Sequence, residues 1–183
     1  MFRLMAFVLA VSGLSLGSSA RADEAEDKAV ALVEKFGGKV TRDDKAPGKP
    51  VVGVSLFTGP GKVNLKVTDA GLKELAALKN LTTLMLGGAK VTDAGLKELA
   101  ALKSLTTLNL NGTAVTDAGL KELAALKGLT TLGLFNMYVT AAGLKELAEL
   151  KNLSTLDLSD KQVTDAGLKE LQKALPKCKI ITK

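Results

Sequence analysis

Histidine and tryptophan are absent from this 183-residue chain, and cysteine occurs only once. Without histidine, the chain lacks the commonest general base and the commonest metal-binding side chain. Cys178 cannot form an internal disulfide, and a nucleophilic role would need a nearby base and an activating environment. We therefore predict no enzymatic activity, no catalytic residue, no metal site and no cofactor. We expect Cys178 to be buried as a small apolar side chain.

Aromatic residues are also scarce, at 3% of the chain, although the formal net charge of +6 is basic. A basic balance can indicate a nucleic-acid partner. Here, however, each lysine of a recurring row is followed directly by a glutamate, and a phosphate-binding surface would lack that acidic row. We therefore predict a mixed, solvated face and no nucleic-acid binding. The two rows are Lys73, Lys97, Lys121, Lys145 and Lys169, and Glu74, Glu98, Glu122, Glu146 and Glu170.

The first 22 residues have the layout of a secretory signal peptide. A basic start at Arg3 precedes an apolar run over residues 4–16, and Ala20-Arg21-Ala22 forms a small-residue cleavage pattern. The run is shorter than the roughly 20 apolar residues of a membrane span, which disfavours an uncleaved anchor. We therefore expect cleavage near Ala22, export to the periplasm, cell surface or medium, and no membrane span in the mature chain.

A nine-residue motif recurs every 24 residues, with starts at Val67, Val91, Val115, Val139 and Val163. It reads Val-Thr-Asp-Ala-Gly-Leu-Lys-Glu-Leu, except that Ala141 replaces the aspartate in the fourth copy. Each motif predicts a short helix with an N-cap oxygen from the threonine or the aspartate. We interpret the aligned aspartates as helix starts rather than a calcium array. The Leu-x-x-Leu-x-Leu segment that follows predicts a short strand.

The segment Leu105–Val115 resembles the leucine-rich-repeat consensus, and the Val-Thr-Asp-Ala-Gly-Leu segment resembles its F-box-type and cysteine-containing subclasses. The resemblance covers Val51 to the C-terminus. It implies the α/β class: a right-handed solenoid with a parallel β-sheet on the concave side and short α-helices on the convex side. At the position where the family consensus has asparagine, this chain departs from the family: it has Ala89, Thr113, Met137 and Lys161. We therefore expect no asparagine ladder, and we expect a looser coil at Lys161.

The chain divides into a signal peptide (1–22), an N-terminal cap (23–50) and a repeat domain (51–183) whose C-terminal cap covers about 172–183. The first cap should be a helix plus a loop, because Ala29, Leu32, Val33 and Phe36 share one helical face before Gly37-Gly38. Ten residues separate Leu56 from Val67, which predicts an inserted loop around residues 58–61. The lysines of the final segment should discourage edge-to-edge pairing.

The strand faces differ between repeats while the helices are almost copied, which indicates where binding could occur. Strand alternation predicts that Met85, Asn109, Gly133 and Asp157 form one concave column, with Gly87, Asn111, Phe135 and Ser159 beside it. The alternative for the aromatic residues of the fourth repeat is that they fill a local gap. The candidate contacts are Met85, Asn109, Asn111, Phe135, Tyr138 and Asp157.

The family resemblance implies binding to a protein or another macromolecule, and we expect an exported binding module. The alternative is a structural or surface-associated protein that self-assembles without a discrete ligand. Five or six strands about 4.8 Å apart give a concave strip of about 400 Å². A standard interface uses about 800 Å² per partner, so this strip alone would bind weakly. The oligomeric state and the ligand stay open at this point.

Overall fold

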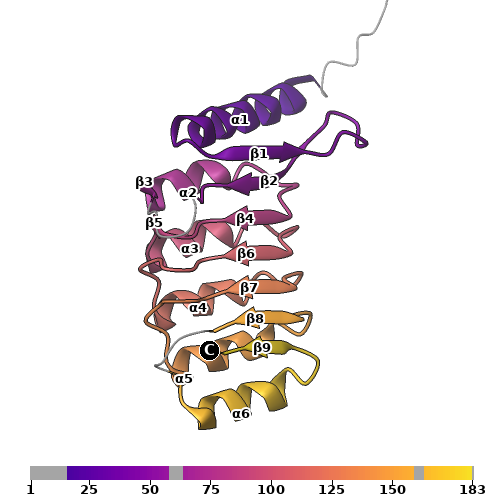
Figure 1. Ribbon diagram of the computed structural model, residues 1–183. Coiled ribbons are helices and arrows are strands. Elements are labelled where there is room, and N and C mark those ends of the chain that lie inside the picture. Colours follow the sequence, from indigo (N-terminus) through magenta and orange to yellow (C-terminus); the bar gives the residue numbers. More distant parts are fainter. Residues whose placement is uncertain (1–15, 58–63, 159–162, 183) are drawn as a thin grey trace, which may run out of the picture.

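The computed structural model describes residues 16–57, 64–158 and 163–182, and it stacks the repeats into a solenoid. Figure 1 shows the strands on one side of the stack and the helices on the other. The main sheet has seven strands in the order β1-β2-β4-β6-β7-β8-β9, all parallel except β1, while β3 and β5 form a small second sheet. The α/β solenoid expected from the sequence is confirmed.

The strands are β1 (Lys39–Arg42), β2 (Val51–Ser55), β3 (Asn64–Thr68), β4 (Thr83–Met85), β5 (Ala89–Lys90), β6 (Thr107–Asn109), β7 (Thr131–Gly133), β8 (Thr155–Asp157) and β9 (Lys179–Ile181). The α-helices are α1 (Leu16–Lys35), α2 (Asp69–Leu75), α3 (Asp93–Leu99), α4 (Asp117–Leu123), α5 (Ala141–Glu146) and α6 (Asp165–Ala174). A 3₁₀ turn, η1 (Leu147–Glu149), follows α5. In the part of the chain that the structure describes, no helix is both long and apolar enough to cross a membrane.

The leucines of each repeat form a continuous core between the sheet and the helices. In the repeat that begins at Val91, every leucine from the helix through the strand is fully buried. Successive strands pair in register, so that Leu84, Leu108, Leu132 and Leu156 lie beside one another. One repeat cannot bury these side chains alone, whereas stacked repeats bury them against each other.

The aspartate of each motif joins its repeat to the next one. The Asp69 carboxylate accepts hydrogen bonds from the backbone N–H of Thr92 (2.8 Å) and from its hydroxyl group (2.7 Å), 23 residues along the chain. The same pair of bonds links Asp93 to Thr116 and Asp117 to Thr140. We call this series the aspartate–threonine ladder. The sequence left open whether threonine or aspartate caps the helix; in α3, α4 and α5 it is the threonine hydroxyl that accepts an N–H of the first turn.

The glycine of the motif makes room for this ladder. A Cβ atom added to Gly95, Gly119 or Gly143 would collide with a carboxylate oxygen of the preceding repeat's aspartate. The helix and the carboxylate can approach closely only because the side chain is missing at this position. Aspartate, threonine and glycine therefore act together to join neighbouring repeats, and the set recurs every 24 residues.

A second ladder lies where each strand begins. The Thr106 hydroxyl donates to the carbonyl oxygen of Thr82 (3.1 Å), and Thr130 does the same toward Thr106 (3.0 Å). At the two ends of the series, the Thr82 hydroxyl donates to the carbonyl oxygen of Val52, and the Ser154 hydroxyl donates to that of Thr130. In each Leu-Thr-Thr-Leu segment, the first threonine thus bonds to the neighbouring repeat and the second faces the concave side.

Asn64 takes the consensus asparagine position in the first unit, which the sequence analysis did not recognise. It pairs with Ala89 between β3 and β5, and its buried amide donates to the carbonyl oxygens of Phe36 and Leu56, both at 3.1 Å. The expected absence of an asparagine ladder concerned the later repeats. Because of the extra residues after Leu56, Asn64 does not lie 24 positions before Ala89, so the repeat spacing did not reveal it.

The N-terminal end contains one strand where the sequence analysis predicted only a helix and a loop. Strand β1 pairs antiparallel with β2, and Arg42 donates to Glu26 of α1 (2.7 Å) and to the carbonyl oxygen of Lys49 (3.0 Å). Helix α1 begins at Leu16 and includes the predicted cleavage position near Ala22. Residues 1–15 of the predicted signal peptide, the inserted loop around 58–61 and Lys161 lie outside the described residues.

The ladder ends at Ala141, which has no carboxylate to offer Thr164. The Thr164 hydroxyl instead accepts the N–H of Gly167, at 3.3 Å. At the same junction a cleft of about 200 Å³ opens between α5 and α6, lined mainly by apolar side chains such as Leu144 and Leu171. Helices α5 and α6 therefore lack the aspartate–threonine bonds of the earlier junctions, although Lys145 forms an ion pair with Glu170 across this one (3.6 Å).

Replacing Asp93 with alanine should lower the free energy of unfolding by about 1–3 kcal/mol, because two charge-assisted hydrogen bonds are lost. Asp165 is the matched control, since it holds the same place in the first turn of α6, after which no further repeat helix follows among the described residues. Asp165→Ala should cost at most about 1 kcal/mol, from the helix dipole alone. Urea unfolding measures both, and equal losses would contradict a role between repeats.

Introducing aspartate at Ala141 should extend the ladder to Thr164 and raise the free energy of unfolding by about 1 kcal/mol. Ala142→Asp is the control, because it puts the same charge into the same helical turn but one position away from the ladder. Only Ala141→Asp should raise the urea midpoint clearly. If both variants behave alike, the gain comes from the helix dipole and not from Thr164.

Candidate functional site: the concave face

The concave face of the sheet consists of three columns of side chains that run along the stack. The register of the strands confirms that Met85, Asn109, Gly133 and Asp157 are neighbours, with Ser55 before them; we call this the middle column. The threonine column contains Thr83, Thr107, Thr131 and Thr155. The exit column follows the strands and contains Phe57, Gly87, Asn111 and Phe135, two positions after the residues of the middle column. Ser159, expected in the same column, lies outside the described residues.

Two asparagines are held in fixed orientations near the centre of this face. The Asn109 side-chain oxygen accepts the backbone N–H of Asn111 at 3.0 Å. The Asn111 side-chain oxygen accepts the backbone N–H of Phe135 at 2.9 Å. Because a backbone N–H can only donate, the oxygen atoms must face these groups and the amide NH₂ groups must point elsewhere.

Glycines leave space for these asparagines and for an aromatic ring. A Cβ atom on Gly133 would lie 2.7 Å from the Asn111 side-chain oxygen and 3.4 Å from the Asn109 amide nitrogen. One on Gly87 would lie 3.0 Å from the Phe57 ring, so the ring of Phe57 covers Gly87. The exit column is therefore low at its centre and bounded by Phe57 and Phe135.

The exposed aromatic side chains gather beside these polar groups. Among residues 24–57, 64, 66–158 and 163–182, where side-chain burial is described, the exposed large apolar side chains are Phe57 (45% exposed), Phe135 (46%) and Tyr138 (72%). Neither aromatic residue of the fourth repeat fills a local gap. Tyr138, however, forms a bridge with Thr116 where the chain returns to the helices, so it lies on the flank rather than on the concave sheet.

The remaining candidates lie toward the two ends of the middle column. Met85 is half-buried beside a cleft of about 330 Å³ that Lys39, Thr41 and Ser55 also line. Asp157 is half-buried between Gly133 and Ile181. The sequence analysis missed Phe57 because its comparison of repeats began at Met85. Counting one residue past Leu56 would have placed it in the exit column.

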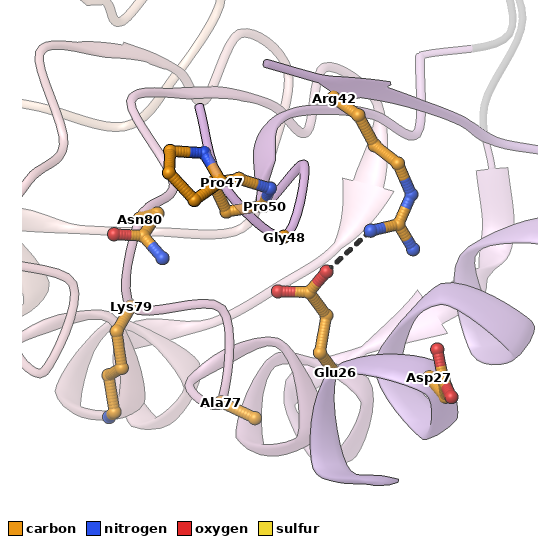
Figure 2. Close-up of a pocket in the computed structure, with 9 residues that line it drawn as sticks. All are labelled: Glu26, Asp27, Arg42, Pro47, Gly48, Pro50, Ala77, Lys79 and Asn80. Carbon is orange, nitrogen blue, oxygen red and sulfur yellow. Dashed lines mark hydrogen bonds and ion pairs between the residues drawn. The ribbon is translucent and has the colours of Figure 1, made fainter. Parts of the chain in front are cut away.

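A further cleft of about 380 Å³ lies away from the concave columns, between α1, the loop after β1 and the end of α2. Figure 2 shows the Glu26–Arg42 ion pair on one side of the cleft and Lys79 and Asn80 on the other, with Pro47, Gly48 and Pro50 between them. The Glu26–Arg42 pair ties α1 to the segment after β1 at this cleft. Within the described residues, no group of three histidine, cysteine or acidic side chains could hold a metal ion.

Comparison with known proteins identifies the type of repeat. A family model described as Zer-1-like leucine-rich repeats matches residues 96–182, and one described as a leucine-rich repeat matches residues 77–100. No curated protein matches the chain. The structure is similar to the leucine-rich-repeat ectodomain of the receptor kinase SOBIR1 from Arabidopsis thaliana, with a TM-score of 0.54 and 15% identity over 87% of this chain and 92% of that one.

Two bacterial structures also match. A leucine-rich-repeat protein of Leptospira interrogans is 32% identical, with a TM-score of 0.48 over 60% of this chain and 27% of that one. An internalin from Listeria monocytogenes is 24% identical, with a TM-score of 0.43 over 61% of this chain and 37% of that one. The chain thus spans only about a quarter to a third of these two proteins. The repeats of this chain are leucine-rich repeats, and such domains generally bind proteins and are typically non-catalytic.

Cys178 is a buried free thiol directly before β9, and its burial raises the pKa of the thiol above the ordinary value of 9.0. Because the thiolate is the reactive form, a raised pKa leaves less of it at pH 8. We expect a disulfide reagent to label the native protein at least tenfold more slowly at pH 8 than the urea-unfolded protein. Equal labelling rates would show that the C-terminal cap is open in solution.

Proposed function

We propose that this chain is an exported, non-catalytic binding module that holds a protein partner on its concave face. The observation that carries the proposal is the place of the exposed aromatic residues. Phe57 and Phe135 stand in one column of the concave side, about three strand spacings or 14 Å apart. Exposed aromatic side chains of this kind are common anchors in protein interfaces.

Within each repeat, the residues that hold the solenoid together differ from those on the concave face, and this separation supports a binding role. The repeated aspartate, threonine, glycine and leucine residues are engaged between neighbouring repeats or in the core. Among the positions that differ between repeats, those of the middle and exit columns lie on the concave face, where Phe57 and Phe135 are about half exposed. A surface that is freed from stacking in this way is available to a partner.

Export and the absence of catalysis are part of the same proposal. The basic, apolar and small-residue pattern of residues 1–22 supports export. The sequence has no histidine, so a catalytic site would need another general base. The alternative of self-assembly through the sheet edges is disfavoured by the charges on both edge strands, which carry Lys39 and Arg42 in β1 and Lys179 in β9.

The double variant Phe57→Ala and Phe135→Ala should lose the partner. The mature chain is used to capture partners from the exported fraction, and the partner's affinity is then measured for each variant. We expect at least a tenfold weakening, which corresponds to about 1.4 kcal/mol. Tyr138→Ala is the control, since it removes the most exposed aromatic side chain from the flank of the same repeat.

Two outcomes would contradict the proposal. One is that the double variant retains the same partner with unchanged affinity, although it unfolds at the wild-type urea concentration. The other is a concentration-dependent rise in mass by light scattering that the double variant does not alter, because this would favour self-assembly through another surface.

A further inference from the structure

We infer that Asn109 and Asn111 form a donor pair for the main-chain carbonyl oxygens of an extended polypeptide segment, whose apolar side chains pack on Phe57 and Phe135. This inference rests on the proposed function and names the kind of partner that the concave face recognises. It follows from the hydrogen-bond inventory of the exit column, the size of the surface and the spacing of the two rings.

Most main-chain N–H groups in and beside the central part of the exit column are already engaged. The backbone N–H groups of Leu86, Gly88 and Gly112 donate to the carbonyl oxygens of Asn109, Asn111 and Phe135 in the next repeat. The N–H groups of Asn111 and Phe135 donate to the two asparagine side chains. A polypeptide that lies across these strands therefore meets few free main-chain donors, and side-chain donors must supply the rest of its hydrogen bonds.

The asparagine amides are those donors. Their oxygen atoms are fixed by backbone N–H groups, so both NH₂ groups face away from these bonds, and neither donates to another of the described residues. No buried side-chain nitrogen or oxygen in the same part of the chain lacks a partner, which means that these NH₂ groups reach solvent. Two fixed NH₂ groups select acceptor oxygens, and an extended peptide supplies one carbonyl per residue.

The size of the face favours a segment over a folded partner. The strip of about 400 Å² is half of the 800 Å² that a standard interface uses on each side. A short extended segment needs less area than a folded domain. Phe57 and Phe135 are about 14 Å apart along the stack, and four residues of an extended chain advance about 13 Å. Side chains at positions i and i+4 point to the same face, so both can meet a ring.

Asparagine-to-aspartate variants separate the donor role from the structural one. In Asn109→Asp and Asn111→Asp, a carboxylate oxygen still accepts the backbone N–H, while the NH₂ donors are lost. The probe is a random nonapeptide display library, selected on the wild-type chain. We expect the selected peptides to carry apolar residues four positions apart. Each aspartate variant should bind them at least tenfold more weakly, with an unchanged urea midpoint.

The outcomes distinguish this inference from the proposed function. If selected peptides bind both aspartate variants as tightly as the wild type, or if no peptide is enriched, the donor pair is wrong while the capture experiment still tests the concave face. Binding of cellohexaose that Asn111→Asp abolishes, without peptide enrichment, would assign the site to carbohydrate and overturn the inference. A captured partner that the Phe57→Ala and Phe135→Ala double variant binds with unchanged affinity would count against the proposed function instead.

Discussion

The fold depends on the hydrogen bonds between an aspartate carboxylate and the threonine that opens the next repeat. A single repeat is too short to bury its own leucines, so its stability comes from its neighbours. The carboxylate satisfies a backbone N–H and a hydroxyl group at once, at 2.6–2.8 Å in three successive junctions. The threonine in turn caps its helix, and the glycine admits the carboxylate. These bonds fix the distance and the angle at which successive helices stack.

The strands pair in register along the same stack, and this register creates the surface. Because residues 24 positions apart pair directly, any change at one strand position alters one point of a continuous column. Because the motif residues hold the repeats together, the side chains of the concave face are not needed for stacking. Asn109 and Asn111 are an intermediate case, since their oxygen atoms serve the fold and their NH₂ groups do not.

The sequence predicted the parts of this structure that follow from a period, and it failed where the period is broken. The repeats, the strand columns and the exposed side of Asn109 could be predicted from spacing alone. The partner of each aspartate could not, because a bond over 23 residues leaves no local signal and helix capping explained the same residue. Phe57 and Asn64 flank an insertion, so the 24-residue spacing does not align them with the matching positions of the later repeats. Strand β1 is polar and short, and its pairing with β2 defines it rather than its own pattern.

The position of the proposed site relative to the ladder explains how so small a surface could recognise a flexible ligand. The columns from Phe57 to Phe135 lie in front of helices joined by all three aspartate–threonine junctions. The junction at Ala141, which lacks the aspartate–threonine bonds, lies beyond them, toward the C-terminus. An extended segment loses conformational entropy when it binds, and a rigid, preorganised set of donors and rings keeps the receptor's share of that cost low. Regular stacking is thus found where recognition is proposed, and the junction without aspartate–threonine bonds lies outside that region.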